Sequence, residues 1–278
     1  SFAASKGIDP VNQLIQTAGR INDSSISTRL PLPEHRDELY QLATTINDLL
    51  NRIENSFRRE KQITADVSHE LRTPLTTIRG TLEVLIRKPR EPIQYEQKVS
   101  QVIREVDRMH QLLEQLLQLA RIEAGSVPVH TESVWLALFL QNLQEKWQTR
   151  LNEKQIVMRF NIPEIVCIAA DGALLELIVG NLVDNALKYG NRGGTIQCTW
   201  DTTAHALVVA DDGPGISPEQ LPFLFDRFYR VDGSRNSSVQ GTGLGLSIVK
   251  KLADLQGIKI RVGSREGAGT AFSLVFPS

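Results

Sequence analysis

A histidine–glutamate pair, His69 and Glu70, has the residue types and spacing for acid–base or nucleophilic chemistry. On a helix of about 100° per residue, His69 points about 160° away from Val67 and from Leu71, its apolar neighbours on either side. An outward imidazole can meet another molecule, and the Glu70 carboxylate can take a proton from the ring, making its other nitrogen a better nucleophile. Thr73 follows one turn later on nearly the same face. A single exposed helix histidine is usually only a solvated residue, so this pair decides nothing alone.

Two asparagines and a lysine share one face of a strongly helical segment, residues 181–189. Asn181, Asn185 and Lys188 stand at positions i, i+4 and i+7, which lie above one another on a helix. Two amide oxygens beside one ammonium suit a phosphate-bound Mg²⁺ ion, because Mg²⁺ prefers hard oxygen ligands. A plain polar helix face uses the same residue types, so the segment is only moderately specific.

A carboxylate stands directly after a short apolar strand, which we expect over residues 207–210. The run that follows it is Asp211-Asp212-Gly213-Pro214-Gly215. Its two glycines predict a tight turn beside a cavity, where the first carboxylate can accept a hydrogen bond from an exocyclic amine. An ordinary acidic turn has a similar composition, and this alternative stays open.

A glycine trio precedes the last predicted helix. The run is Gly241-Thr242-Gly243-Leu244-Gly245. Glycines at a helix N-terminus let backbone N–H groups approach phosphate oxygens. A dinucleotide-binding βαβ fold is excluded, because no such unit opens here and the spacing is not GxGxxG.

The elements that must position these residues are of two kinds, and the first 124 residues predict long helices. Apolar residues recur at alternating intervals of three and four, the spacing of a coiled-coil seam. Pro31 and Pro33 interrupt this pattern and predict an extended connector, and residues 88–92 end the helix that carries His69. The two series around that break are Val67, Leu71, Leu75, Ile78, Leu82 and Leu85, then Val99, Val102, Val106, Met109, Leu113, Leu116 and Ala120.

One helical hairpin cannot bury both apolar stripes well, whereas two hairpins side by side form a four-helix bundle, so we expect a homodimer.

After Gly125 the sequence changes to short β-rich runs, at residues 155–161, 195–201, 206–210, 258–263 and 270–276. Helical runs lie between them, at residues 135–151, 173–189 and 243–256. This mixture predicts an α/β sandwich, with helices on one face of a mixed sheet.

The composition limits the partners and the compartment. The 278 residues carry a formal net charge of -1, which gives no electrostatic footprint for nucleic acid. Cys167 and Cys198 belong to no CxxC pair, so we expect two buried free thiols in a reducing compartment. No apolar stretch approaches the roughly 18 residues that a membrane span needs, and the chain does not begin with methionine. We therefore expect a soluble piece of a longer protein.

Together these segments resemble the sensor histidine kinase family of two-component systems. Residues 1–60, and within them 8–60 with Pro10 and the pair Asp37 and Glu38, look like a HAMP linker. The five motif likenesses, in the family's order, are 68–75 to the H box, 181–189 to the N box, 211–215 to the G1 box, 225–230 to the F box and 241–246 to the G2 box. A small departure is Ile258, where the family commonly has a second glycine, and it does not touch the site.

The resemblance implies a multidomain α + α/β fold. A coiled-coil HAMP linker over 1–60 precedes a dimeric helical hairpin (four-helix bundle) over 61–124, and residues 125–278 form an α/β sandwich of the Bergerat/GHKL type that binds ATP. The partner implied is the receiver domain of a response regulator, which takes the phosphoryl group on an aspartate. No nucleic acid is implied. The membrane is implied only through N-terminal segments that precede this cytoplasmic piece, which places the longer protein in the bacterial plasma membrane.

The resemblance also assigns residue roles. His69 would be the phosphoacceptor, Glu70 its general base, and Thr73 would serve in dephosphorylating the regulator. Asn181 and Asn185 would hold Mg²⁺, and residues 231–240 would form a lid over the nucleotide. The ATP-binding residues that it implies are Asn181, Asn185, Lys188, Tyr189, Asp211, Gly213, Gly215, Arg230, Gly241, Thr242, Gly243, Leu244 and Gly245.

Two other functions remain to be weighed. An ATPase of the same fold that uses hydrolysis for conformational work would have no reason for the His69 segment. A coiled-coil scaffold with an inactive nucleotide fold would have no reason for the asparagines, Asp211 and the glycines.

Overall fold

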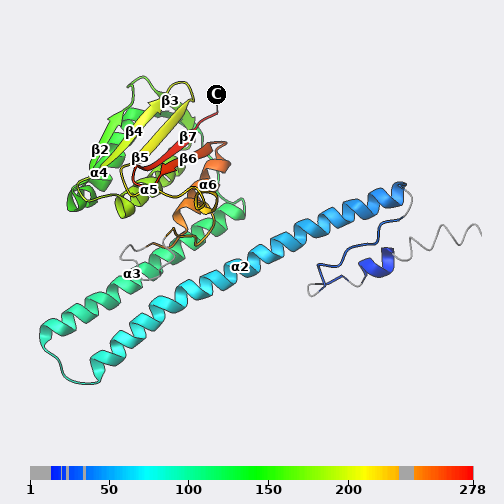
Figure 1. The fold of residues 1–278 in the computed structure, drawn as a ribbon, viewed down its shortest axis with the longest axis horizontal. Helices are drawn as coiled ribbons and strands as arrows, with labels where there is room; N and C mark the ends of the chain where they lie inside the picture. The colour runs from blue at the N-terminus through cyan, green and yellow to red at the C-terminus, as the bar shows by residue number, and fades with distance from the viewer. Residues whose placement is uncertain (1–13, 20, 23–24, 34–35, 232–240, 278) are drawn as a thin grey trace, which may run out of the picture. The chain divides into compact units, whose positions relative to one another are not determined.

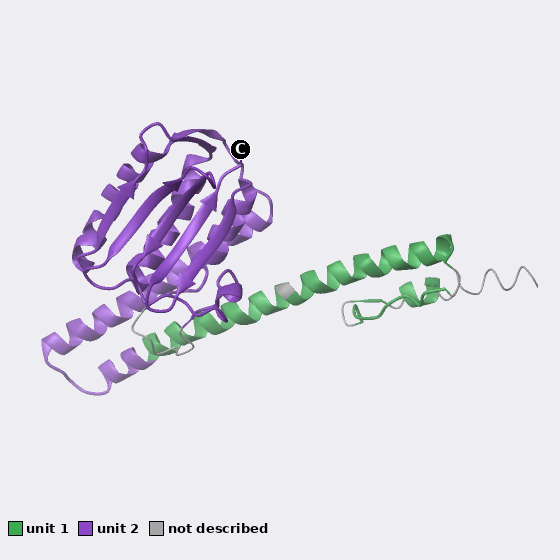
Figure 2. Cartoon of the chain, turned by 45° about the horizontal axis from the view of Figure 1, so that its top comes forward, with its two compact units in different colours: residues 1–79 green, residues 80–278 purple. Residues whose placement is uncertain are grey.

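The computed structural model describes the chain except for residues 1–13, 20, 23–24, 34–35, 232–240 and 278. Pro10 of the expected HAMP linker and nearly all of the expected lid, residues 232–240, lie outside the described part. The chain divides into two compact units, Ser1–Arg79 and Gly80–Ser278 (Figure 2). Within the described residues, no helix combines the length and the apolar character that crossing a membrane requires.

The first unit is built around α2, which begins at Glu38 and continues without interruption to Ile86, through Pro74. A small apolar cluster joins this helix to the preceding segment through Leu14, Leu30 and Ala43. Asn47 satisfies both backbone groups of Leu30, donating to its carbonyl at 3.0 Å and accepting from its N–H at 2.8 Å. The segment broken by prolines therefore runs beside α2 as a connector.

The second unit begins at Gly80, near the end of α2, and continues with the second helix of the hairpin, α3 (Pro92–Glu123). Proline is favoured in a first helical turn, where its missing N–H has no intrahelical partner. The helix carries two apolar stripes. Leu112, Leu119 and Ile122 are buried within the chain. The other stripe is half exposed, and its members are Val99, Ile103, Val106, Leu113 and Leu117.

A five-stranded mixed sheet forms the rest of the second unit, in the order β2-β4-β5-β7-β6. The β2–β4 pair is parallel and the other pairs are antiparallel. Helices α4, α5 and α6 cover one face, and each contacts a strand (Figure 1). The strands are β2 (Val157–Asn161), β4 (Thr195–Asp201), β5 (Ala206–Asp211), β6 (Lys259–Arg265) and β7 (Gly269–Val275), and the helices are α4 (Leu136–Lys154), α5 (Gly172–Tyr189) and α6 (Gly245–Leu255).

The α/β sandwich predicted from the sequence is thus confirmed, with its five strands and three helices in the expected places. The core lies between the helices and the sheet, where Leu182, Ile196 and Leu207 are at most 1% exposed. Full burial of each such side chain stabilises the fold by about 2 kcal/mol. Helix α5 lies at the centre of the helical layer and contacts both α4 and α6.

A two-stranded antiparallel sheet, β1 (Glu132–Trp135) with β3 (Cys167–Ala170), was not predicted. Each strand has only four residues, too few to show a period. Asp171 follows β3 and caps α5, accepting hydrogen bonds from the N–H groups of Leu174 at 3.0 Å and His130 at 2.8 Å. Burial alone would raise the pKa of this carboxyl, but these hydrogen bonds outweigh it and lower the pKa.

The two cysteines lie in different environments, and the expectation that both are buried is wrong for Cys167. Side chains of β3 alternate between the exposed and buried faces, and Cys167 falls on the exposed face. The missed strand is the reason for the error. Cys198 lies inside β4 with 0% exposure, and burial raises the pKa of its thiol to about 12.

Candidate active site

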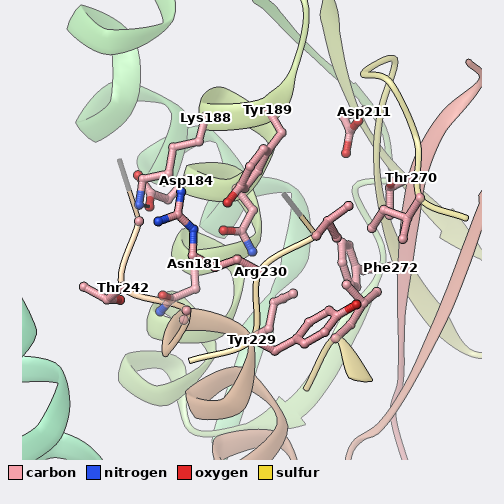
Figure 3. Close-up of a pocket in the computed structure, with 18 of the residues that line it drawn as sticks. Asn181, Asp184, Lys188, Tyr189, Asp211, Tyr229, Arg230, Thr242, Thr270 and Phe272 are labelled. Atoms are coloured by element: carbon pink, nitrogen blue, oxygen red, sulfur yellow. Dashed lines mark ion pairs between the residues drawn. The ribbon is translucent and has the colours of Figure 1, made fainter. Parts of the chain in front are cut away.

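A cavity of about 220 Å³ opens in the second unit between α5, the end of β5, β7 and the N-terminus of α6 (Figure 3). Eleven of the thirteen residues predicted to bind ATP line it. They are Asn181, Asn185, Lys188, Tyr189, Asp211, Gly215, Arg230, Gly241, Thr242, Gly243 and Gly245. The segments that carry them are far apart in the sequence, so the fold gathers the separate motifs into one site.

Helix α5 supplies one wall. Asn181, Asn185 and Lys188 face the cavity, as their spacing predicts. The Lys188 ammonium is paired at 2.5 Å with the carboxylate of Asp184, one turn earlier on the same helix. The other oxygen of Asp184 binds Arg150 of α4 at 2.8 Å. Asp184 therefore holds the lysine at the cavity wall and limits its freedom.

The amide of Asn181 is oriented by its own helix. Its Nδ2 donates to the carbonyl oxygen of Leu177 at 2.8 Å, which leaves the Oδ1 atom turned toward the start of α6. A Cβ atom added to Gly245 would lie only 2.9 Å from that oxygen. The glycine therefore lets the N-terminus of α6 approach the amide closely. The free N–H groups and positive dipole end of a helix N-terminus favour an anion at this place.

Asp211 marks the opposite end of the cavity (Figure 3). Its Oδ1 accepts a hydrogen bond from the N–H of Gly213 at 2.9 Å. Burial raises the pKa of the Asp211 carboxyl, and the nearby Asp212 adds to the effect, although hydrogen bonds from Gly213 and Thr270 oppose it. Thr270 lies directly across the β5–β7 ladder from Asp211 and also lines the cavity.

An apolar surface accompanies Asp211. Ring contacts at 5.7 Å between centroids hold Tyr229 against Phe223 beside the cavity. The apolar and aromatic lining residues include Ile216, Leu224, Tyr229 and Phe272. A flat aromatic heterocycle with an exocyclic amine would find both a stacking surface and a carboxylate acceptor here.

The glycine-rich segment is fixed by a close backbone contact with the F-box-like segment. Phe228 donates its N–H to the carbonyl of Gly243 at 3.0 Å, and both residues have positive φ, 60° and 72°. A Cβ atom at Gly243 would lie 2.7 Å from the Phe228 backbone. Only glycine fits at that position without displacing the other segment.

The two remaining predicted ATP-binding residues lie behind the cavity surface. Leu244 is 0% exposed and belongs to the core. Gly213 packs near the Asp211 carboxylate and the Tyr189 carbonyl oxygen. Both positions are consistent with a role in shaping the walls of the cavity.

The predicted catalytic residues His69, Glu70 and Thr73 lie on α2, in the first unit. In the single chain His69 and Glu70 are half-buried and Thr73 is exposed. The Thr73 hydroxyl lies 3.4 Å from the backbone carbonyl oxygen of His69, so any bond between them is weak. Because α2 is continuous here, Thr73 follows His69 by one helical turn on nearly the same face of the helix, as the sequence predicts.

Several lining residues were not predicted. Asp184 sits inside the recognised helical motif, and its position at i−4 from Lys188 is the signal that predicts an ion pair. Thr270 and Phe272 were predicted only as strand residues.

Gln115 reaches the cavity from α3, where its Oε1 accepts a hydrogen bond from the Thr242 hydroxyl at 2.5 Å. Its polar side chain interrupts the buried stripe of Leu112, Leu119 and Ile122, a pattern visible in the sequence.

Three family models match consecutive parts of the chain. The HAMP domain matches residues 2–55, and the His Kinase A (phospho-acceptor) domain matches residues 59–125. The histidine kinase-, DNA gyrase B-, and HSP90-like ATPase matches residues 170–278, which contain almost all of the cavity lining.

Curated proteins of similar sequence carry matching names. Sensor histidine kinase YkoH of Bacillus subtilis is 33% identical over 99% of this chain and 61% of its own length. Sensor protein IrlS of Burkholderia pseudomallei is 30% identical over 98% of this chain and 59% of its own length. The chain thus spans about three fifths of the length of these relatives.

Solved structures show the same fold. Full-length ShkA in complex with AMPPNP is 27% identical, with a TM-score of 0.55 over 77% of this chain and 45% of that one. Histidine kinase ThkA in complex with response regulator protein TrrA has a TM-score of 0.63 at 23% identity, over 81% of this chain and 65% of that one. The second likeness concerns the fold alone.

Proposed function

Because the chain belongs to the sensor histidine kinase family, we propose that it uses ATP to phosphorylate His69 and passes the phosphoryl group to an aspartate of a response regulator. The observation that carries this proposal is the cavity, whose two ends match the two ends of ATP. Asp211 and the apolar wall suit adenine, whereas Lys188 and the start of α6 suit phosphates. The solved relative ShkA holds the ATP analogue AMPPNP.

The residues at the phosphate end fit a magnesium ion. Asn181 and Asn185 line the cavity, and the bond from Asn181 Nδ2 to Leu177 leaves its oxygen available. Amide oxygens are hard ligands of the kind Mg²⁺ accepts, with phosphate oxygens and water completing the shell. When bound, the ion would neutralise charge on the phosphates. Lys188, held by Asp184, would add a second positive charge there.

His69 would be the nucleophile in the transfer. A ring nitrogen forms a bond to the γ-phosphorus while the bond from that phosphorus to the bridging oxygen breaks, and ADP leaves. Glu70 takes the proton from the other ring nitrogen. Because His69 and the cavity belong to different units, the reaction requires the two units to meet, and correct positioning supplies much of the rate.

Incubating the chain with γ-labelled ATP and Mg²⁺ tests the proposed function. We expect label on the protein that survives base and is lost in acid, as a phosphohistidine is. Free phosphate without protein label would instead indicate an ATPase. Absence of both products, together with no nucleotide binding, would indicate a scaffold.

The proposed role of Asp211 predicts a pH dependence of nucleotide binding. The adenine amine needs an ionised acceptor, so the affinity for MgADP should fall as pH drops through the raised pKa of Asp211, above its ordinary 3.8. Asp211→Asn should bind about tenfold more weakly at neutral pH and lack this component of the pH dependence, because a neutral amide oxygen that does not titrate replaces the charged acceptor. Calorimetric titrations of both proteins at several pH values measure it.

The same pKa shift affects folding in the opposite direction. The folded, nucleotide-free protein binds the Asp211 proton more tightly than the unfolded chain does. Its contribution to stability is therefore present at low pH and is lost as pH rises through the raised pKa. Parallel pH dependences of the affinity for MgADP in wild type and Asp211→Asn would contradict the assignment of the adenine contact.

We further propose that Thr73 serves a phosphatase reaction on the regulator. Its exposed hydroxyl, one turn after His69, can orient a water molecule for attack on an aspartyl phosphate. Thr73→Ala should keep autophosphorylation and slow the decay of a phosphorylated regulator, measured with ADP present. Thr76→Ala is the matched control, because that hydroxyl is also exposed and bonds to its own helix at 2.8 Å. Equal decay rates with wild type and Thr73→Ala would refute the role.

We propose that the chain acts as a homodimer through the half-exposed stripe of α3. Val99, Ile103, Val106, Leu113 and Leu117 follow intervals of four, three, seven and four, the spacing of a coiled-coil seam. Val106→Asp should therefore convert a dimer into a monomer at micromolar concentration, as measured by sedimentation. Gln111→Asp, on the same helix but off the stripe, should remain dimeric. A dimeric Val106→Asp protein would contradict this interface.

The whole protein would be a membrane sensor. This proposal rests on the HAMP match at residues 2–55 and on the greater length of the relatives. The stimulus would then act through the connector and α2 on the helical hairpin. Fractionation of cells that express the full-length gene tests the location, and recovery outside the membrane fraction would refute it.

A further inference from the structure

The end of α3 is attached to the nucleotide-binding part of the second unit by polar contacts at two places. Glu123, in the last turn, forms an ion pair with Arg227 and lies 4.0 Å from Lys251 of α6. Two turns earlier, Gln115 accepts the hydrogen bond from Thr242. Leu119 and Ile122, between them in sequence, are at most 5% exposed, and α3 contacts α6 directly (Figure 1). We call Gln115, Leu119, Ile122 and Glu123 the docking face of α3.

Gln115 differs from the rest of the docking face because it also lines the nucleotide cavity. Thr242, its partner, lies near Asn181 and Lys188, at the end that suits phosphates, and away from Asp211 and Thr270 (Figure 3). The hairpin therefore contributes a side chain to the phosphate end of the site.

The hydrogen bonds around Thr242 determine which end of the Gln115 amide is available. The Thr242 oxygen accepts from the N–H of Leu244 at 3.3 Å, so its own proton goes to Gln115 Oε1. The Nε2 group of Gln115 has two N–H donors, and within the described residues it meets no protein acceptor. An amide donor at the wall of a phosphate site is complementary to a phosphate oxygen.

We propose that Gln115 is a positioning residue of the nucleotide site. Its Oε1 holds Thr242 while its Nε2 donates to an oxygen of the terminal phosphates of the nucleotide. The nucleotide then bridges α3 and the α/β sandwich, so nucleotide binding and docking of α3 stabilise each other. This inference rests on the proposed ATP site and names a residue outside its recognised motifs.

Binding of MgAMPPNP and of AMP to the full chain tests this inference. Gln115→Ala should lower the affinity for MgAMPPNP about tenfold and leave that for AMP unchanged, because AMP lacks the terminal phosphates. Gln115→Glu should lower it at least as much. The glutamate keeps an acceptor for Thr242 but replaces the donor with a negative charge. Wild-type affinity in Gln115→Glu, or an equal loss for AMP, would overturn the phosphate contact.

The coupling to docking is tested with Glu123→Arg, which places like charges against Arg227 and Lys251 without touching the cavity. It should reproduce the loss for MgAMPPNP, and combining it with Gln115→Ala should add little. Gln111→Ala and Glu114→Arg are the matched controls on the same helix and should bind as wild type does. Additive losses, or unchanged binding in Glu123→Arg, would overturn the coupling.

If wild type binds no nucleotide, the proposed function itself fails. If wild type binds nucleotide and the Gln115 variants bind it equally well, this inference alone is rejected.

Discussion

His69→Gln is expected to reduce labelling of the protein by γ-labelled ATP to the background of a reaction without protein. Glutamine keeps a polar side chain on the helix surface but has no ring nitrogen to form the bond to phosphorus. The variant should still bind MgADP as wild type does, because the cavity lies in the second unit. Acid-stability of the label and calorimetric binding are the two measurements.

The control for this variant is His110→Gln. His110 is an exposed histidine on the second helix of the hairpin, and it has no glutamate beside it. It should label at the wild-type rate. Appreciable acid-labile phosphate on His69→Gln would reject His69 as the acceptor, and the other four histidines would then be tested one by one.

Asn185→Ala is expected to lower the Mg²⁺-dependent labelling rate about a hundredfold or more. The substitution removes an amide oxygen from the phosphate end of the cavity, where charge must be neutralised during transfer. The labelling rate is measured over a range of Mg²⁺ concentrations. Excess Mg²⁺ should recover part of the activity if the lost group is a metal ligand.

Asn142→Ala on α4 is the matched control, because it makes the same chemical change at an exposed position away from the cavity. It should retain full activity. A wild-type rate in Asn185→Ala would refute the metal role. Equal loss at every Mg²⁺ concentration, with a lowered melting temperature, would instead show damage to α5.

The fold was largely predictable, because its long elements have clear periods and its strands are separated by turn residues. The two short strands β1 and β3 were missed, and with them the exposure of Cys167. A run of four residues shows no reliable alternation, and β3 exists through its pairing with a partner more than thirty residues earlier. Such pairing is a tertiary effect that local composition does not encode.

The cavity lining was predicted where residues stand in a distinctive local motif, and it was missed where the fold brings in an ordinary residue. Asn181 and Lys188 stand in a recognisable spacing. Thr270 reaches the cavity only through its register opposite Asp211, and Gln115 only through the docking of α3. Both are unremarkable as residue types, so their roles follow from the three-dimensional arrangement.

Cys167 gives the molecule a natural attachment point for a spectroscopic probe. The chain has two cysteines, and only the thiolate form reacts with common labels. Cys198, buried with a pKa of about 12, stays protonated, whereas Cys167 is exposed and lies outside the residues that line the nucleotide cavity. A fluorophore would therefore attach at one site without mutagenesis. Its anisotropy would report whether the α/β sandwich tumbles freely or together with α3 as nucleotide is added.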